Sequence, residues 1–583
     1  MKANNNKAIG NWLRDIEDET LCLPRFQRKR VWSEQKVCQF LKTLVLNTKT
    51  PVGVFLVLPT DPSNPAFPPR TIQGVISDSC ACNSLLLDGQ QRLSALWKAL
   101  NDEKAPDNEE KDCRYYIQFN NQFEIEDVKS ASKSATSEEA RYQDPKKQYK
   151  KRWFPVKLLN PLLEEKEVDG WLQTLELKKT NPKNHDSLRK LIIKTRKVFS
   201  KKQSGGKVIP YFLLPTSTDR DSAIDVYQTI NTNLVKLSDH YLAVAAMERE
   251  TGESLYDMAK KLTDEVSSIK DLETDEIGEL ILKISCVLQG KKPSGGSYRA
   301  SDFDFNKVLD GEQEIFKGVA WAVKKLGELK IWHGSQLPSV VPLRVLPAIY
   351  QYMPKSGPKL AIANEIIGKY LWHAFLTARY DRQANDRLKE DYDHLEAYFL
   401  KEEKSNEDII KIFEEYGRPD KKEIKDAHWP QGKGRLPRGI LLVCCQGGAR
   451  TLASNESLTV DNYGLRERHH VFPKSKLSKK DSFGNNVLNC LLVPKEDNIK
   501  YSNDLPGDYI NKLFEELKTP LPQVKVVDRL ETHLISKKLA GKLVETTQSK
   551  IESSQVTLES VYHNFLETRA KDVGGKINEL LDG

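Results

Sequence analysis

Two adjacent histidines and two later asparagines make one stretch of the chain a candidate for phosphodiester hydrolysis. Residues 466–506 read RERHHVFPKSKLSKKDSFGNNVLNCLLVPKEDNIKYSNDLP. Hydrolysis of a phosphodiester needs an activated water, a divalent cation on the leaving and non-bridging oxygens, and a group that orients the base. The imidazole and amide side chains of this stretch suit these roles.

The four side chains can be assigned to these roles one by one. Because imidazole titrates near neutral pH, His470 is the candidate general base. His469 points to the other face of the same strand-like run and can reach a metal ion on the side of the following helix. Asn498 offers that ion a hard amide oxygen, which suits Mg²⁺ or Mn²⁺. Asn489 would brace the loop and hold the imidazole of His470 in one tautomer. The alternative is two surface histidines beside a turn-rich, Asn-rich loop.

The order of these residues resembles the HNH nuclease core, a ββα-metal hairpin and helix, in the branch whose last ligand is Asn. The likeness is carried by the His-x-x-Pro opening, the central Asn beside LLVP, and the closing Asn-x-Lys. It implies that His470 and Asn489 are catalytic residues and that His469 and Asn498 hold the metal. In that family the residue before the base is usually Asp, so His469 departs from the pattern.

Lysines surround the same stretch, at Lys474, Lys476, Lys479, Lys480 and Lys500. A run of charge is usually a solvated face, but beside a nuclease hairpin it is a reasonable track for phosphates. We take Lys474 and Lys500 as candidates for contact with the DNA backbone.

A second group of chemically useful residues lies in the first hundred positions. LPRFQRKRVW begins at residue 23, and LLLDGQQRLSAL covers residues 85–96. The periodicity predicts a helix over 34–46, strands over 53–58 and 85–87, and a turn at Asp88-Gly89 into another helix. A turn that leads into a helix N-terminus presents free backbone amides to an anion.

The side chains of that turn add further donors for phosphates or a base edge, from Gln90, Gln91 and Arg92. No GxxxxGK[ST] motif occurs in the chain, so a nucleotide would not be bound by a P-loop. Structural roles are the alternative: Asp88 could cap its helix, Arg92 could form a surface ion pair, and Phe26 and Trp32 could be core aromatics.

Together these two motifs resemble the ParB/sulfiredoxin-like DGQQR family, the amino-terminal half of type IV restriction and phage-defence proteins of the GmrSD and SspE kind. Those proteins carry an HNH domain at the carboxyl end. A third element, DVYQTINTNLVKLSDHYLAVAAM at 225–247, is similar to the family's helix ending in Asn-Thr, here Asn231 and Thr232. The Gly that often follows is Asn233 in this chain.

The resemblance implies binding and hydrolysis of a nucleoside triphosphate at Asp88, Gly89, Gln90, Gln91 and Arg92. It also implies that the preceding motif helps to recognise modified DNA, through Phe26, Gln27, Arg28 and Trp32. Arg and Gln can contact phosphates and base edges, and aromatic rings can pack against an unusual substituent.

Composition and length are those of a soluble protein of several domains. The chain has 583 residues, 30% charged residues and a net charge of +8, which is mild for its size. No apolar run approaches a bilayer span, and MKANNNKAIG has no signal-peptide core, so we expect a cytoplasmic protein without membrane contact. The nine cysteines form no CxxC pair, which indicates core thiols and not a zinc knuckle.

The pattern along the chain predicts a multidomain α+β protein that is mostly helical. We expect a ParB/sulfiredoxin-like sensor or NTPase domain over 1–237, with a charged insert at about 101–150 that contains one strand-like run at 114–119. A helical connector over 238–415 follows, with apolar residues at three- and four-residue spacing. The nuclease domain would cover 416–583 and end in carboxyl-terminal helices. Residues 435–445 enter it as a helix or a strand.

The leading hypothesis is a modification-dependent DNA endonuclease of phage defence. Nucleotide binding in the first domain would regulate metal-dependent nicking or cleavage of double-stranded, modified phage DNA by the HNH domain, in a chain that could form a homodimer. One alternative is a non-cleaving, nucleotide-switched DNA-binding regulator with a degenerate HNH domain, which the histidine at position 469 favours. Another is an RNA-targeting nuclease toxin.

Overall fold

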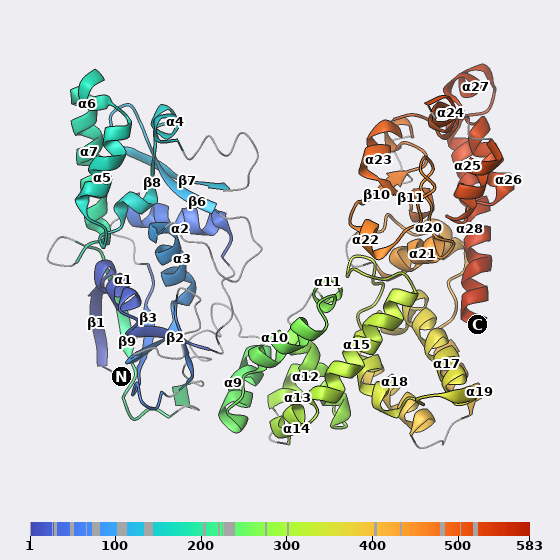
Figure 1. Cartoon of the computed structure of the whole chain (residues 1–583), viewed down its shortest axis with the longest axis horizontal. Helices are drawn as coiled ribbons and strands as arrows, with labels where there is room; N and C mark the ends of the chain where they lie inside the picture. Colours follow the sequence, from blue (N-terminus) through green and yellow to red (C-terminus); the bar gives the residue numbers. More distant parts are fainter. Residues whose placement is uncertain are drawn as a thin grey trace. The chain divides into compact units, whose positions relative to one another are not determined.

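The computed structural model forms two compact units, Met1–Ala245 and Ala246–Gly583 (Figure 1). The structure describes residues 2–25, 27, 32–46, 52–65, 67–72, 82–101, 113–132, 144–201, 206–219, 222–223, 226, 239–273, 277–299, 302–400, 405–431, 434–477, 484–501, 503–516 and 523–582.

A mixed six-stranded sheet forms the centre of the first unit, in the order β1-β9-β3-β5-β2-β4. Its strands are β1 (Lys2–Ala8), β2 (Leu21–Pro24), β3 (Phe55–Pro59), β4 (Pro69–Arg70), β5 (Ser84–Asp88) and β9 (Val208–Leu213). β3 pairs antiparallel with β5 and parallel with β9. The central position of β3 and β5 explains their near-continuous apolar sequences, because both faces of a central strand are covered. The two strands predicted over 53–58 and 85–87 are thus confirmed within two residues.

Two strands of the charged insert form a separate sheet with a strand that follows it, in the order β7-β6-β8. The strand-like run at 114–119 is β6 (Cys113–Phe119), which pairs with β7 (Ile125–Ser132) and β8 (Trp153–Pro155). The strand predicted at 114–119 is thus confirmed, whereas β7 was not predicted. IEDVKSAS has few β-branched residues and weak alternation, and β7 is stabilised by its pairing with β6.

Helices cover these sheets and complete the core of the first unit. They are α1 (Ile9–Glu17), α2 (Glu34–Leu46), α3 (Gln90–Asn101), α4 (Pro145–Lys150), α5 (Glu165–Thr174), α6 (Leu177–Thr180) and α7 (Pro182–Arg196), with short 3-10 turns η2 (Val156–Leu159) and η3 (Lys197–Phe199). α2 matches the helix predicted over 34–46. One apolar cluster joins α1, β3 and α3, with Trp12, Phe55 and Leu93 among its buried members.

The second unit is helical over its first part, as the apolar spacing predicted. Its helices are α10 (Leu255–Glu265), α11 (Ile269–Leu272), α12 (Ile277–Leu288), α13 (Gly295–Arg299), α14 (Phe305–Asp310), α15 (Glu312–Glu328), α16 (Pro342–Ile349), α17 (Gly357–Leu376), α18 (Ala384–Phe399) and α19 (Asn406–Glu414), with the turns η5 (Tyr350–Tyr352) and η6 (Ala378–Tyr380). α9 (Asp239–Thr251) spans the boundary between the units.

The last part of the second unit combines a small hairpin with helices (Figure 1). Its elements are α20 (Lys421–Asp426), α21 (Arg435–Cys445), α22 (Val460–Tyr463), β10 (Arg466–His470), η7 (Lys474–Lys476), η9 (Val487–Asn489), β11 (Cys490–Pro494), α23 (Lys495–Tyr501), α24 (Pro506–Glu516), α25 (Gln523–Glu531), α26 (Lys537–Glu545), α27 (Gln548–Ser553) and α28 (Leu558–Asp582). Residues 435–445 are therefore helical, with Pro437 in the first turn, where its missing N–H costs little. α17 contacts both α21 and α28.

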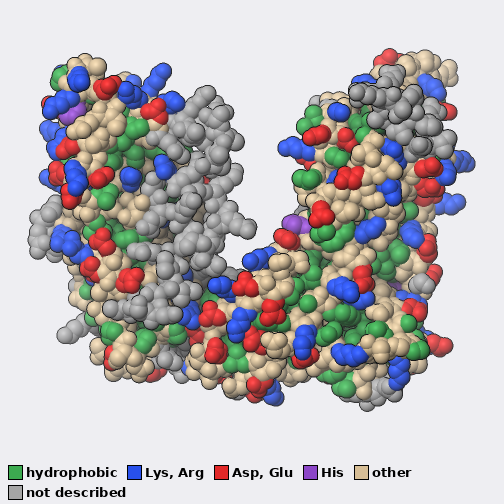
Figure 2. Space-filling view, in the orientation of Figure 1, with side chains coloured by type: hydrophobic (Ala, Val, Ile, Leu, Met, Phe, Trp, Pro, Cys, Tyr) green, Lys and Arg blue, Asp and Glu red, His purple; other side chains and the backbone are tan. Residues whose placement is uncertain are grey.

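Three further predictions concern the surface charge, membrane-spanning helices and the cysteines. Figure 2 shows basic and acidic side chains interspersed on the visible face of each unit, in keeping with the mild net charge. Within the described ranges, no helix is long and apolar enough to cross a membrane. Cys82, Cys286, Cys444, Cys445 and Cys490 are buried free thiols, as expected, but Cys22 is disulfide-bonded.

Candidate active site

The predicted catalytic stretch folds as a strand, a loop, a second strand and a short helix. β10 pairs antiparallel with β11, so that His469 lies opposite Leu491 and His470 opposite Cys490. α23 follows β11 directly and contacts both strands. The arrangement agrees with the order of elements expected for an HNH core, whose identity here stays a prediction.

His469 and Asn498 meet on one face of the hairpin. The imidazole Nδ1 of His469 lies 2.9 Å from the amide oxygen Oδ1 of Asn498. The amide nitrogen of Asn498 donates to Oε2 of Glu467 at 2.8 Å. Glu467 was not predicted, although the two-residue period of β10 places it on the same face as His469. The sequence therefore held a signal for this third side chain.

Burial sets the protonation of His469. The side chain is 2% exposed and lies against the rings of Tyr501 and Tyr509, with centroid distances of 5.4 and 5.5 Å. Desolvation in this apolar setting lowers the pKa of His469 to about 4. The ring is therefore neutral near pH 7, which is the form that can bind a metal ion.

An imidazole nitrogen and an amide oxygen are donor types that a divalent cation can use. In this structure Nδ1–H of His469 donates a hydrogen bond to Oδ1 of Asn498 at 2.9 Å, so an ion held by both atoms would have to replace that bond. Among the described residues, no group of three or more His, Cys, Asp or Glu side chains could hold a metal ion. The fit therefore depends on the amide oxygen of Asn498, with Glu467 next to it.

His470 occupies the other face of β10. Its Nε2 lies 3.3 Å from Oδ1 of Asn485, and its ring stacks on that of Trp429 with centroids 3.9 Å apart and planes 8° from parallel. Burial, and secondarily the charge of nearby Lys474, lower the pKa of His470, while the contact with Asn485 opposes them. Neither Trp429 nor Asn485 was predicted. Asn485 lies in the Asn-rich loop of the motif, but nothing in the sequence points to Trp429.

Asn489 braces the loop, as predicted, but its bonds do not include His470. The side chain is fully buried, and its Oδ1 accepts from the backbone N–H of Phe472 at 2.8 Å. Its Nδ2 donates to the carbonyls of Phe472 at 3.0 Å and Gly484 at 3.1 Å. The expected hold on the imidazole of His470 falls to Asn485, because Asn489 is turned into the loop.

Arg569 of α28 supports the same loop from behind. This fully buried guanidinium donates to the carbonyls of Leu488 and Cys490, on either side of Asn489, and to that of His533 at 2.9 Å. A buried charge needs such dipoles, since desolvation without partners is costly. The sequence marked α28 only as a carboxyl-terminal helix, and the role of its arginine depends on tertiary packing.

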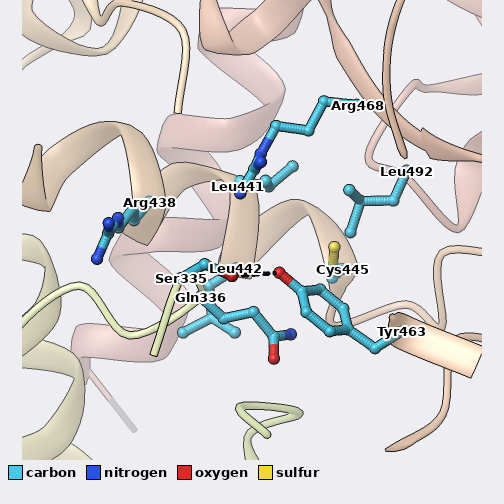
Figure 3. A pocket seen from close by; sticks show the side chains of 9 residues that line it. All are labelled: Ser335, Gln336, Arg438, Leu441, Leu442, Cys445, Tyr463, Arg468 and Leu492. Atoms are coloured by element: carbon cyan, nitrogen blue, oxygen red, sulfur yellow. Dashed lines mark hydrogen bonds between the residues drawn. The ribbon is translucent and has the colours of Figure 1, made fainter. Parts of the chain in front are cut away.

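A small apolar pocket lies where the hairpin meets the helical part of the second unit (Figure 3). Its lining residues are Ser335, Gln336, Arg438, Leu441, Leu442, Cys445, Tyr463, Arg468 and Leu492. The hydroxyls of Ser335 and Tyr463 are 3.0 Å apart, and Arg438 donates to the carbonyls of Gly334 and Leu337. Packing through this pocket links the 334–337 loop to β10, the strand that carries both histidines.

In the first unit, the DGQQR turn joins β5 to α3 as predicted. Gly89 has φ +110°, and a Cβ there would strike the ring of Phe55. Gly53 has φ +91° and faces the guanidinium of Arg92, so a side chain there would displace it. Both positions therefore need glycine.

Arg92 is committed to protein oxygens. Its guanidinium donates to the carbonyls of Val52 and Val54 and to the carboxylate of Asp88, each at 3.0 Å. It also lies 5.1 Å from the ring centroid of Phe55. The side chain thus ties the start of β3 to the turn. These bonds leave Arg92 less available for the predicted contact with a phosphate.

The two amino-terminal motifs come together in the first unit. Gln27 is 2% exposed and donates to the carbonyls of Leu86 and Leu87 on β5, at 2.8 and 2.7 Å. The amide of Trp32 donates to Oε1 of Gln91 at 3.3 Å. Gln90 is also buried. These contacts place Gln27 and Trp32 beside the turn. They join residues far apart in the sequence, so no local pattern predicts them.

The two lysines predicted to contact the DNA backbone lie at the surface, and other predicted residues lie outside the described ranges. Lys474 and Lys500 are exposed, as a contact with DNA would require. The predicted residues that lie outside the described ranges are Phe26, Arg28, Asn231, Thr232, Asn233, Lys479 and Lys480.

Comparison with known proteins supports the resemblance in the first unit. The model of the GmrSD restriction endonuclease N-terminal domain matches residues 9–247. An uncharacterized protein of Methanocaldococcus jannaschii is 22% identical over 617 aligned positions that cover 99% of each chain. Residues 9–247 are thus similar to the N-terminal domain of GmrSD restriction endonucleases, which supports a GmrSD-like restriction protein.

Proposed function

We propose that the protein is a metal-dependent DNA endonuclease of phage defence whose nuclease site is the β10–β11–α23 hairpin. One observation carries the proposal: His470 on one face of β10, and His469 beside Asn498 on the other. A GmrSD-type restriction domain in the first unit agrees with such an activity.

The chain's own residues would do the following. His470, kept neutral by burial, would accept the proton of the attacking water at one ring nitrogen. Asn489 would hold the loop that follows the base. Lys474, exposed and near His470, would place a phosphate by charge.

His469 and Asn498 would hold Mg²⁺ or Mn²⁺, with Glu467 positioned to bind the ion or to orient Asn498. When bound, such an ion stabilises charge on the leaving and non-bridging oxygens. The neutral imidazole and the amide oxygen suit a divalent cation. A higher nicking rate with Mn²⁺ than with Mg²⁺ would agree with a nitrogen ligand.

For the first unit we propose nucleotide-dependent control and recognition of modified DNA. Backbone amides at the start of α3, with Asp88, Gly89, Gln90 and Gln91, would bind the nucleoside triphosphate. Arg92 would act by shaping the turn. Gln27 and Trp32 would belong to the recognition surface, because both are bonded to this same region. Phe26 and Arg28 are included in the proposal from the sequence motif alone.

A nicking assay tests the proposal. Supercoiled DNA, plain or carrying methyl, hydroxymethyl or glucosyl groups on cytosine, is incubated with Mg²⁺ or Mn²⁺ and the parent chain or His470→Ala. We expect metal-dependent nicking by the parent on at least one of these DNAs and a rate lower by about a hundredfold or more for the variant. Equal rates for both chains would overturn the assignment of the hairpin.

Two further measurements on the parent chain distinguish the alternative functions: its affinity for DNA and its rate of cleavage of RNA. Tight DNA binding without nicking by the parent would favour the non-cleaving regulator, for which the absence of a three-ligand cluster of His, Cys, Asp or Glu among the described residues is a supporting observation. Cleavage of RNA in preference to DNA would favour the toxin.

A further inference from the structure

The closest aromatic contact to the candidate base comes from outside the catalytic stretch. The rings of Trp429 and His470 have centroids 3.9 Å apart and planes 8° from parallel. Aromatic pairs in proteins prefer offset or edge-to-face packing at larger separations, of about 4.5–7 Å. The indole therefore covers one face of the imidazole and leaves its edge, with the two nitrogens, for contacts elsewhere.

Trp429 is held in place by a strap that we define as residues 425–430. The backbone N–H of Val487 donates to the carbonyl of Ala427 at 3.1 Å, and His428 forms a β-bridge with Asn486. The side chain of Asn486 donates to the carbonyl of Lys425 at 2.6 Å. These bonds attach the strap to the loop that also carries Asn485 and Asn489.

The other side of the strap is attached to α28. α20, which leads into it, begins with a capping box at Asp420 and contacts α28. Lys425 lies 3.2 Å from Glu567, and Lys421 also pairs with that carboxylate. Trp429 is thus anchored on both sides, which lets it act as a fixed surface for His470.

The hydrogen bond of the His470 ring to the described residues is weak by comparison. It joins Nε2 to Oδ1 of Asn485 over 3.3 Å, near the upper limit for such a bond. A single long bond leaves the ring free to tilt, whereas a parallel stack fixes its plane. A base must be aligned with its water to act, and a misplacement of about 1 Å can cost a hundredfold in rate.

We infer that Trp429 is a positioning residue for His470, in an inference that rests on the nuclease function proposed above. The indole fixes the plane of the imidazole, so that a ring nitrogen points to where the attacking water must be. Trp429 itself touches neither the water nor the phosphate.

The test compares full-length variants in single-turnover nicking at saturating protein, on the supercoiled DNA and metal that support parent activity. Trp429→Ala should lower the rate by roughly ten- to a hundredfold, with the dissociation constant for DNA unchanged. Trp429→Phe, which keeps a flat ring, should retain most of the rate. Trp321→Ala is the matched control, because Trp321 is also half-buried in the second unit but packs on Tyr350.

A double-mutant cycle separates positioning from general damage. If Trp429 acts through the imidazole, Trp429→Ala should have no further effect on the residual rate of His470→Ala. Three outcomes would overturn the inference. The first is a further loss of rate when Trp429→Ala is added to His470→Ala, and the second is a Trp429→Phe rate as low as that of Trp429→Ala. The third is weaker DNA binding by Trp429→Ala with an unchanged rate at saturation. A defect in His470→Ala with parent-like Trp429→Ala would refute the positioning role alone, whereas full activity of His470→Ala would refute the proposed nuclease site.

Discussion

At the Gly89 turn, the guanidinium of Arg92 donates to three protein oxygens, whereas at the hairpin the ring of His470 has, among the residues that the structure describes, one long hydrogen bond and one stacked aromatic ring. His470 is the last residue of a strand and Arg92 lies just after one, and both were predicted to do chemistry. A side chain whose donors are used by the protein stabilises a conformation, and one that is positioned but incompletely bonded can still accept a proton. The comparison separates a residue that shapes a site from one that reacts within it.

The largest effect is expected at the reacting residue. His470→Ala should lower metal-dependent nicking by about 10²–10⁴-fold, the usual contribution of a general base, with folding and DNA binding retained. His563→Ala, at an exposed position on α28, is the control. If His470→Ala retains activity within about tenfold of the parent, His470 is not the base and, like Arg92, only maintains the shape of its site.

The metal side of the hairpin should respond to metal concentration. Asn498→Ala removes the proposed oxygen ligand and should reduce nicking at limiting Mn²⁺ by about 10–100-fold, as losses around metal sites do. Excess Mn²⁺ should restore part of the rate of Asn498→Ala. Asn498→Asp keeps an oxygen at this position, so it should reach the same rate at a lower Mn²⁺ concentration. A defect of the same size at every Mn²⁺ concentration would mean that Asn498 serves only to hold Glu467 and His469.

Arg92→Ala should act on stability. It removes charge-assisted hydrogen bonds that contribute about 1.5–3 kcal/mol in typical cases, so β3 and α3 should open more readily. Hydrogen exchange of their peptides, read by mass spectrometry, measures this loss, and Arg14→Ala at an exposed position on α1 is the control. Lower nucleotide affinity with unchanged exchange would contradict the comparison and restore Arg92 as a phosphate ligand.

The smallest effect concerns acid sensitivity of the second unit. Burial lowers the pKa of His373 on α17 from 6.5 to about 4, so the folded state binds fewer protons than the unfolded state between these values. The free energy of unfolding should therefore fall as pH drops from 6.5 towards 4, by up to ~1.4 kcal/mol per pH unit for this group.

His373→Phe should make that dependence shallower, because its ring can take the place beside Phe413 without titrating. Hydrogen exchange of α17 peptides at pH 7 and pH 5, corrected for intrinsic rates, measures it. The same pH dependence in His373→Phe and in the parent would mean that burial does not lower the pKa of His373.

Much of the fold could be predicted because it follows from local patterns. The helix at Glu34–Leu46 and the strands β3 and β5 are indicated by apolar spacing, and the turn by Asp88-Gly89. β7 was missed, since its stability comes from pairing with β6 and not from its own residues. The division of the second unit into a connector and a nuclease domain stays a prediction.

For the candidate site, the sequence by itself determined the chemistry available: the histidine pair on opposite faces of a strand, and asparagines to brace a loop and meet a cation. Tertiary structure alone decided the partners. Trp429 lies on His470, Asn485 replaces Asn489 beside it, and Arg92 is bonded to the start of β3. The physical reason is that periodicity determines which face a residue occupies, whereas contacts between distant segments depend on how whole elements pack.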